Sequence, residues 1–209
     1  MPPGRSARAE EILGHAMRLF AERGYQAVSV AEIQVAAGMT PGSGALYKHF
    51  PTKQALLEAG IDRFIAQGRD ATVELPSPNG TELDELLRHV GGLVLKTLAH
   101  DQDSLRVAWR DLPAFPALSS RFIDERLQVG FAQLAHWLTE LSESGVVHVD
   151  DAEGTAGVLL SALAFFGLME AMLGVRPGRL SDSRFLDAWV EVAVGALGPR
   201  EPKARSRRR

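Results

Sequence analysis

The sequence has no cysteine and no long uncharged apolar stretch, and each absence excludes a class of protein. Without cysteine, the 209-residue chain cannot form a disulfide framework, a thiolate metal site or a thiol nucleophile. The longest run without a charged residue, 154–169, has 16 residues, which is shorter than a membrane-spanning helix requires. The first five residues contain no apolar stretch of the kind found in secretory signals. We therefore expect a soluble, cytoplasmic protein with no membrane partner.

Familiar catalytic motifs are missing as well. The chain contains no His-Glu-x-x-His zinc motif, no phosphate-binding loop with its lysine, and no Gly-x-Ser-x-Gly nucleophile turn. Its 6 histidines are scattered, without the spacing of metal ligands. These absences predict a protein that is not an enzyme, with no catalytic residues, no metal site and no cofactor.

Charge is distributed unevenly along the chain. The formal net charge is −3, but residues 1–55 carry 6 basic against 4 acidic residues, 56–199 carry 11 against 21, and 200–209 carry 6 against 1. A weakly acidic total therefore allows an anionic partner at the amino-terminal end. We expect a domain over 1–55, a larger domain over 56–199 and a disordered basic tail over 200–209, which is either a solvated end or a nonspecific contact for nucleic acid.

Helical periodicity dominates, so we expect an all-α fold of about nine helices. Apolar residues recur at helical spacing in every long segment, and no alternating apolar run is bounded by hairpin turns. Local capping and breaking signals mark the helix ends. The residues expected to begin or end helices are Gly24, the capping box Ser29–Glu32, Pro51, Thr52, Gly145, the capping box Asp150–Glu153 and Ser181.

Residues 29–50 are expected to form a helix, a tight turn and a second helix, which is the geometry of helix-turn-helix DNA-binding proteins. Thr40 or Ser43 would cap the second helix, which begins with small residues that permit close approach to base edges and phosphates. Tyrosine, histidine and lysine near its end supply phosphate donors and charge. The candidate DNA-contacting residues are Ser29, Thr40, Ser43, Gly44, Ala45, Tyr47, Lys48, His49 and Lys53.

Five segments of this region carry a recognisable pattern: 16–25, 29–33, 36–40, 44–50 and 53–56. In this order they resemble the DNA-binding signature of the TetR family of transcriptional repressors. The resemblance covers about residues 8–57, whereas the remainder of the chain is similar in length and helical character only. Two departures stand out. The segment 39–45 is longer than its counterpart in the family, and Gln34 replaces a common small alanine, which alters the packing between the two helices.

The resemblance implies a homodimer that represses transcription by binding a near-palindromic operator in double-stranded DNA. It also implies dimerisation through the last two long helices, about 150–174 and 181–198, and release of the DNA by a small-molecule effector, which the resemblance implies to be apolar. Core packing is the alternative role for each aromatic or soft side chain in the central helices. The candidate ligand-binding residues are Trp109, Arg110, Phe131, Phe165 and Met169.

Five alternatives stay open at this point. Tyr47 either contacts phosphate or packs half-buried, and 42–44 either approaches the bases or is a flexible turn. Arg5 and Arg8 form either a disordered arm or a contact to the minor groove or the DNA backbone. The helix expected over about 150–174 is either a dimer helix or a core helix of one chain. A helical ligand-binding protein that has lost DNA binding is the alternative from another class, but residues 40–53 retain the groups that such a protein should lose.

Overall fold

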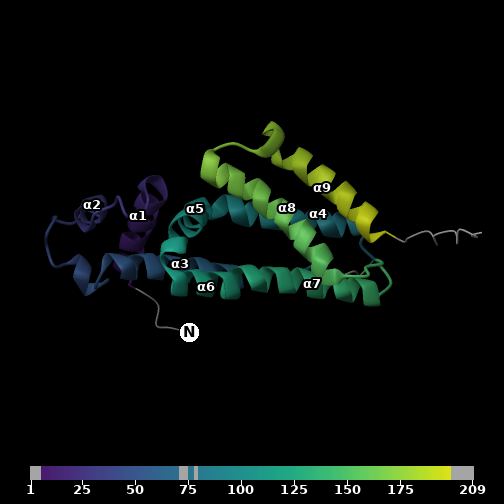
Figure 1. Cartoon of the computed structure of the whole chain (residues 1–209), viewed down its shortest axis with the longest axis horizontal. Helices are drawn as coiled ribbons and strands as arrows, with labels where there is room; N and C mark the ends of the chain where they lie inside the picture. The colour runs from purple at the N-terminus through teal and green to yellow at the C-terminus, as the bar shows by residue number, and fades with distance from the viewer. Residues whose placement is uncertain (1–5, 71–74, 78–79, 199–209) are drawn as a thin grey trace, which may run out of the picture. The chain divides into compact units, whose positions relative to one another are not determined.

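The computed structural model describes residues 6–70, 75–77 and 80–198, and all regular structure in these residues is helical, as the periodicity predicts (Figure 1). Nine α-helices and four short 3₁₀- or π-helical turns lie in this described part, so the expected helix count is approximately right. The expected basic tail 200–209 and Arg5 lie outside it. The α-helices are α1 (Ala7–Arg23), α2 (Val30–Ala36), α3 (Lys53–Asp70), α4 (Leu83–His100), α5 (Gln102–Asp111), α6 (Pro116–Phe122), α7 (Gln128–Glu143), α8 (Ala152–Leu173) and α9 (Asp182–Leu197), and the turns are η1 (Leu46–Lys48), η2 (Leu112–Ala114), η3 (Ile123–Leu127) and η4 (Pro177–Arg179).

The described helices form two compact units. The first unit combines α1, α2, α3, α5 and α6, and the second combines most of α4, α7 and α8 with α9. The expected division at residue 55 is based on sequence patterns, whereas these two units are defined by contacts between helices. The two divisions of the chain therefore differ. In the structure, the helix-turn-helix region shares its unit with α5 and α6.

The core of the first unit is built around one face of α1. Ile12, Ala16 and Phe20 recur at helical spacing, and each is 0% exposed. This face packs closely on α3, because a Cβ added at Gly60 would collide with the sulfur of Met17. The absence of a side chain at Gly60 therefore lets α1 and α3 approach each other.

The core of the second unit is formed by α4, α7, α8 and α9. Trp189 on α9 is buried and donates its indole N–H to the carbonyl oxygen of Leu159 on α8, at 3.0 Å. The rings of Phe166 and Phe185 are stacked with their centroids 3.9 Å apart. These contacts hold α8 and α9 against each other.

Several predicted helix ends are confirmed. The hydroxyl of Ser29 accepts from the amide of Glu32 at 3.2 Å, while the carboxylate of Glu32 accepts from the amide of Ser29 at 2.7 Å, which completes the capping box. Thr52 and Ser181 accept backbone hydrogen bonds at 2.9 and 3.3 Å, at the starts of α3 and α9. Gly24 ends α1 with a φ of 88°, which favours glycine.

The capping box expected over Asp150–Glu153 is wrong. The carboxylate of Asp151, not Asp150, accepts from the amide of Gly154 at 2.8 Å. Asp151 therefore precedes α8, and the position that should return the second hydrogen bond is a glycine, which has no side chain to do so.

Helix α8 is longer than the uncharged run on which the sequence expectation rested. It has 22 residues, an 18-residue window of mean hydropathy 1.9, and only 28% of that window is buried within the chain. By length and composition alone it is the one helix of the described residues that is able to cross a membrane, a test that the core helix of a soluble protein also passes.

Candidate nucleic-acid interface

Helix α2 is fixed at both ends by long arginine side chains. At its start, Arg23 pairs with Glu32 of the capping box at 2.6 Å. At its end, Arg8 donates to the carbonyl oxygen of Ala37 at 2.6 Å, where the last turn of a helix leaves acceptors unsatisfied. Because Arg8 lies inside α1, it is not part of a disordered arm.

The capping box gives Glu32 an unusually acidic carboxyl group. Hydrogen bonds from the amide and then the hydroxyl of Ser29, followed by one from the guanidinium of Arg23, lower the pKa of Glu32 to about 2. Each of these donors favours the charged carboxylate over its protonated form. The start of α2 is therefore held by a carboxylate that stays ionised far below its ordinary pKa.

The second helix of the expected motif is shorter than predicted. Nine residues, 37–45, separate α2 from η1, which is a single 3₁₀ turn of 3 residues. Neither Thr40 nor Ser43 caps it, because Ala45 holds the N-cap position and makes no side-chain hydrogen bond. Instead, the amide of Ser43 donates to the carbonyl oxygen of Thr40 at 3.2 Å, which closes a turn. Gly42 has a φ of 76°, which a helix does not accommodate.

Two buried side chains flank the three exposed residues of the turn at η1. Leu46 is 0% exposed and Phe50 is 4% exposed, so η1 is held against the first unit from both sides. Tyr47, Lys48 and His49 lie between these two side chains, and all three are exposed. At 52% exposure, Tyr47 does not pack as a core residue. A phenol, an ammonium and an imidazole together form a surface with donors and positive charge for phosphate oxygens.

Two of the candidate DNA-contacting residues are engaged within the protein. The hydroxyl of Ser29 belongs to the capping box. The ammonium of Lys53 donates to the carbonyl oxygens of Tyr25 and Val28, both at 2.8 Å. Lys53 therefore fastens the segment between α1 and α2 to the start of α3.

The other candidates lie on the segment that leads into η1 or on η1 itself. Thr40 and Gly44 are exposed, and Ser43 and Ala45 are half-buried. The structure thus brings Thr40, Ser43, Gly44, Ala45 and the exposed Tyr-Lys-His turn into one continuous stretch of chain beyond α2. From the sequence, Gln34 was predicted only to alter the packing between the two helices. In the structure, its buried side-chain amide also hydrogen-bonds to this stretch directly.

The candidate ligand-binding residues are divided between the two units. Trp109 and Arg110 belong to the first unit, and Phe131, Phe165 and Met169 belong to the second. Trp109 is 47% exposed and Phe165 is 56% exposed. Phe131 and Met169 are half-buried. Arg110 is engaged elsewhere, since its guanidinium donates to the carbonyl oxygens of Phe20 and Ala21 and pairs with Asp111.

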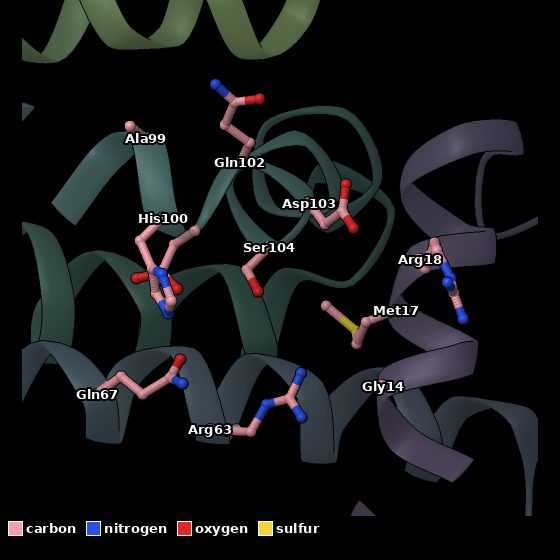
Figure 2. Close-up of a pocket in the computed structure, with 11 residues that line it drawn as sticks. Gly14, Met17, Arg18, Arg63, Gln67, Ala99, His100, Gln102, Asp103 and Ser104 are labelled. Carbon is pink, nitrogen blue, oxygen red and sulfur yellow. The ribbon is translucent and has the colours of Figure 1, made fainter. Parts of the chain in front are cut away.

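A pocket of about 510 Å³ lies within the first unit, between α1, α3 and the junction of α4 with α5 (Figure 2). This volume is in the range of small-molecule sites. Its lining is mainly polar and includes Arg18, Arg63, His100, Asp101 and Asp103. None of the five candidate ligand-binding residues lines it.

A capped helix, an ordered turn and the exposed side chains of Tyr47, Lys48 and His49 are the features of a DNA-binding regulator of the helix-turn-helix class. Residues 12–59 match the family model of bacterial regulatory proteins of the tetR family, and residues 84–197 match that of the AefR-like transcriptional repressor C-terminal domain. The second match alone spans more than half of the chain. The protein belongs to the TetR family of transcriptional regulators.

Relatives agree with this assignment. The HTH-type transcriptional regulator YvkB of Bacillus subtilis is 25% identical over 178 residues, which cover 85% of this chain and 90% of that protein. The HTH-type transcriptional repressor KstR2 of Rhodococcus jostii is 42% identical over 62 residues, 30% of this chain and 29% of that protein. A solved tetR-family regulatory protein from Rhodococcus RHA1 has the same fold, with a TM-score of 0.72 at 22% identity over 94% of this chain and 100% of that one. The names of these relatives describe transcriptional regulators.

Proposed function

We propose that this protein is a cytoplasmic repressor that binds a near-palindromic operator as a homodimer and is released by a small-molecule effector. The observation that carries the proposal is the exposed Tyr47–His49 turn between the buried anchors Leu46 and Phe50. Phosphate contacts fall to this turn, and base contacts fall to Thr40 and the residues 43–45 that precede it. Ser29 and Lys53 act by holding the elements that position these residues.

DNA binding is tested by an electrophoretic shift with DNA from upstream of the protein's own gene and with random DNA of equal length. We expect preferential binding of the upstream fragment, with affinity falling steeply as salt increases, because phosphate contacts release counterions. Equal affinity for the two fragments at every salt concentration would contradict the proposal.

The homodimer is supported by apolar side chains that the second unit leaves exposed. On α8, Val158 is 71% exposed and Phe165 is 56% exposed, two helical turns apart. On α9, Val192 is 68% exposed. Exposed apolar groups on neighbouring helices indicate an interaction surface, and a second copy of the same chain is its commonest occupant in soluble proteins.

The dimer is tested by light scattering at micromolar protein concentration. We expect the mass of two chains for the wild type and for Val129→Glu, whose valine is exposed on α7, but the mass of one chain for Val158→Glu. A wild-type monomer would contradict the proposed dimer. Wild-type protein that floats with phosphatidylcholine vesicles would instead identify α8 as a membrane-contacting helix.

The effector is proposed to be apolar and to bind the second unit, which contains the half-buried Phe131 and Met169. Release of DNA requires that the effector binds the DNA-free conformation more tightly than the DNA-bound one. The proposal is tested by a compound screen for release of a fluorescent operator. We expect Phe131→Ala to weaken the response without changing operator affinity, and His100→Ala in the polar pocket to leave it unchanged. The opposite pattern would place the effector in the first unit.

A further inference from the structure

Gln34 is a polar residue in an apolar environment. Its side chain is only 2% exposed on α2, and its neighbours Ile33 and Ala37 are buried core residues. A buried primary amide is unfavourable unless its donor and acceptor are both satisfied. The position of Gln34 therefore requires hydrogen-bond partners from another part of the chain.

Both partners come from the loop that follows α2. The side-chain N–H of Gln34 donates to the carbonyl oxygen of Ser43 at 2.7 Å, and its side-chain oxygen accepts from the amide of Gly42 at 2.9 Å. The backbone of Gln34 adds a third link, because its carbonyl oxygen accepts from the amide of Met39 at 2.7 Å. One residue of α2 thus holds the loop at its beginning and at its middle.

The left-handed conformation of Gly42 is part of this contact. Its φ of 76° lies in the left-handed region that favours glycine, and a Cβ at this position would meet no atom within 4 Å. The requirement for glycine is therefore conformational rather than steric.

The loop is long for its class. The turn of a helix-turn-helix motif usually has about 3–4 residues, whereas residues 37–45 separate α2 from η1. A longer connection has more conformational freedom to lose when it is ordered on a ligand. The Gln34 amide removes part of that freedom before DNA is bound, which is how preorganisation improves affinity and discrimination.

We propose that Gln34 is a positioning residue for sequence recognition, whose amide fixes the Gly42–Ser43 peptide and so sets the register of Ser43, Gly44 and Ala45 against the base edges. This inference rests on the proposed DNA binding and adds to it a residue that touches no base. Loss of the Gln34 hydrogen bonds should reduce the discrimination between DNA sequences. Phosphate contacts from the Tyr47–His49 turn should persist.

The test compares Gln34→Leu, which keeps the volume and removes both hydrogen bonds, with Gln34→Glu, which retains an acceptor for the Gly42 amide and loses the donor for Ser43. Gln128→Leu, at an exposed glutamine, is the matched control. Gly42→Ala disturbs the same contact from the loop side. Two readouts are used: hydrogen exchange of the Gly42 amide in the free protein, and selection of bound sites from random DNA.

For Gln34→Leu we expect faster exchange at Gly42, a preference for the selected site over random DNA that is at least about 10-fold smaller, and an unchanged salt slope for random DNA. Gln34→Glu should also reduce this preference, because its buried carboxylate would face the Ser43 carbonyl oxygen without a donor, and Gln128→Leu should leave the preference unchanged. In the double variant Gln34→Leu with Gly42→Ala, the preference for the selected site should fall no further than in the more affected single variant, because both substitutions act through one contact.

Unchanged selectivity in Gln34→Leu, with faster exchange at Gly42, would overturn the positioning role while leaving DNA binding in place. Unchanged exchange at Gly42 would overturn the contact itself. If Gln34→Leu fails to fold, the exchange and selectivity of Gly42→Ala decide in the same way. A wild-type protein that selects no sequence would contradict the proposed function, and with it the inference.

Discussion

The ammonium of Lys53 lies 4.2 Å from the centroid of the Tyr25 ring and donates to the carbonyl oxygen of the same tyrosine. A second hydrogen bond, to the carbonyl oxygen of Val28, fixes the segment between α1 and α2. The ring of Tyr25 in turn contacts those of Phe20 and Phe115, with centroids 5.3 and 5.0 Å away. Lys53, although it lies at the DNA-binding end of the chain, thus stabilises contacts within the helix-turn-helix motif.

Lys53 and Lys48 should therefore respond differently to the same substitution. Lys53→Met should lower the free energy of unfolding by about 1–3 kcal/mol, because two charge-assisted hydrogen bonds are lost. Lys48→Met, at an exposed position, should change it by less than about 0.5 kcal/mol and reduce the salt slope of DNA binding by about 1. Denaturant unfolding and a salt titration distinguish the two. Equal stabilities of the variants would contradict the internal role of Lys53.

Glu32 should titrate far below an ordinary glutamate. Its pKa in the folded protein is about 2, against the ordinary value of 4.5 for a glutamate. Because the folded-state pKa is lowered, the stabilisation by the carboxylate is present above about pH 4.5 and is lost as the pH falls toward 2. NMR titration of the Glu32 carboxyl carbon should give a midpoint near 2. The stability difference between wild type and Glu32→Gln should shrink over the same interval, and a midpoint near 4.5 would mean that the capping box does not form in solution.

Gly91 and Gly92 on α4 provide a matched pair for testing the packing of α4 on α9. A Cβ at Gly91 would lie 2.7 Å from Leu186 and 2.9 Å from the ring of Trp189, whereas at Gly92 the nearest atom is 3.7 Å away. The indole cannot move aside easily, because it is buried and hydrogen-bonded to Leu159. Gly91→Ala should destabilise the protein by about 1–3 kcal/mol, and Gly92→Ala should be neutral or stabilising by up to about 1 kcal/mol. Thermal unfolding measures both, and equal effects would exclude the close approach.

Arg110 should contribute more to stability than an exposed arginine. Its guanidinium satisfies carbonyl oxygens of Phe20 and Ala21 at the end of α1 and is held by Asp111, which also accepts from the amide of Tyr25 at 3.3 Å. Arg110→Met should cost about 1–3 kcal/mol, since these acceptors lose a charged donor. Arg88→Met, which breaks only an exposed ion pair with Asp187, should cost about 0–1 kcal/mol. The prediction fails if the two variants unfold at the same denaturant concentration.

Several helix ends were predictable because their capping partners are neighbours in sequence. Ser29 and Glu32 are three residues apart, and the hydrogen bonds that join them are those that the capping-box pattern predicts. The box predicted at Asp150 is wrong because the adjacent Asp151 takes the cap, although its sequence does not fit the capping-box pattern. Local pattern fixes the kind of helix start but not its exact residue.

The loop 37–45 and the turn η1 were less predictable, because their conformation depends on contacts across the fold. Pro41 and the surrounding glycines disfavour an α-helix, yet their number alone does not predict a single 3₁₀ turn. The amide of Gln34 reaches 8 and 9 residues along the chain. Arg110 donates to the carbonyl oxygens of residues that lie 89 and 90 positions away along the chain. Long side chains that satisfy distant carbonyl groups carry no periodicity, so no sequence pattern marks them.

The apolar outer surface of α8 also links folding to abundance. If a second copy covers Val158 and Phe165 as proposed, dimerisation stabilises the folded chain by mass action, and its melting temperature rises with protein concentration. Dilution would then lower operator occupancy twice, once by reducing the number of dimers and once by enlarging the unfolded fraction open to proteolysis. A cell that makes few copies of this regulator would relieve repression more sharply than DNA affinity alone dictates.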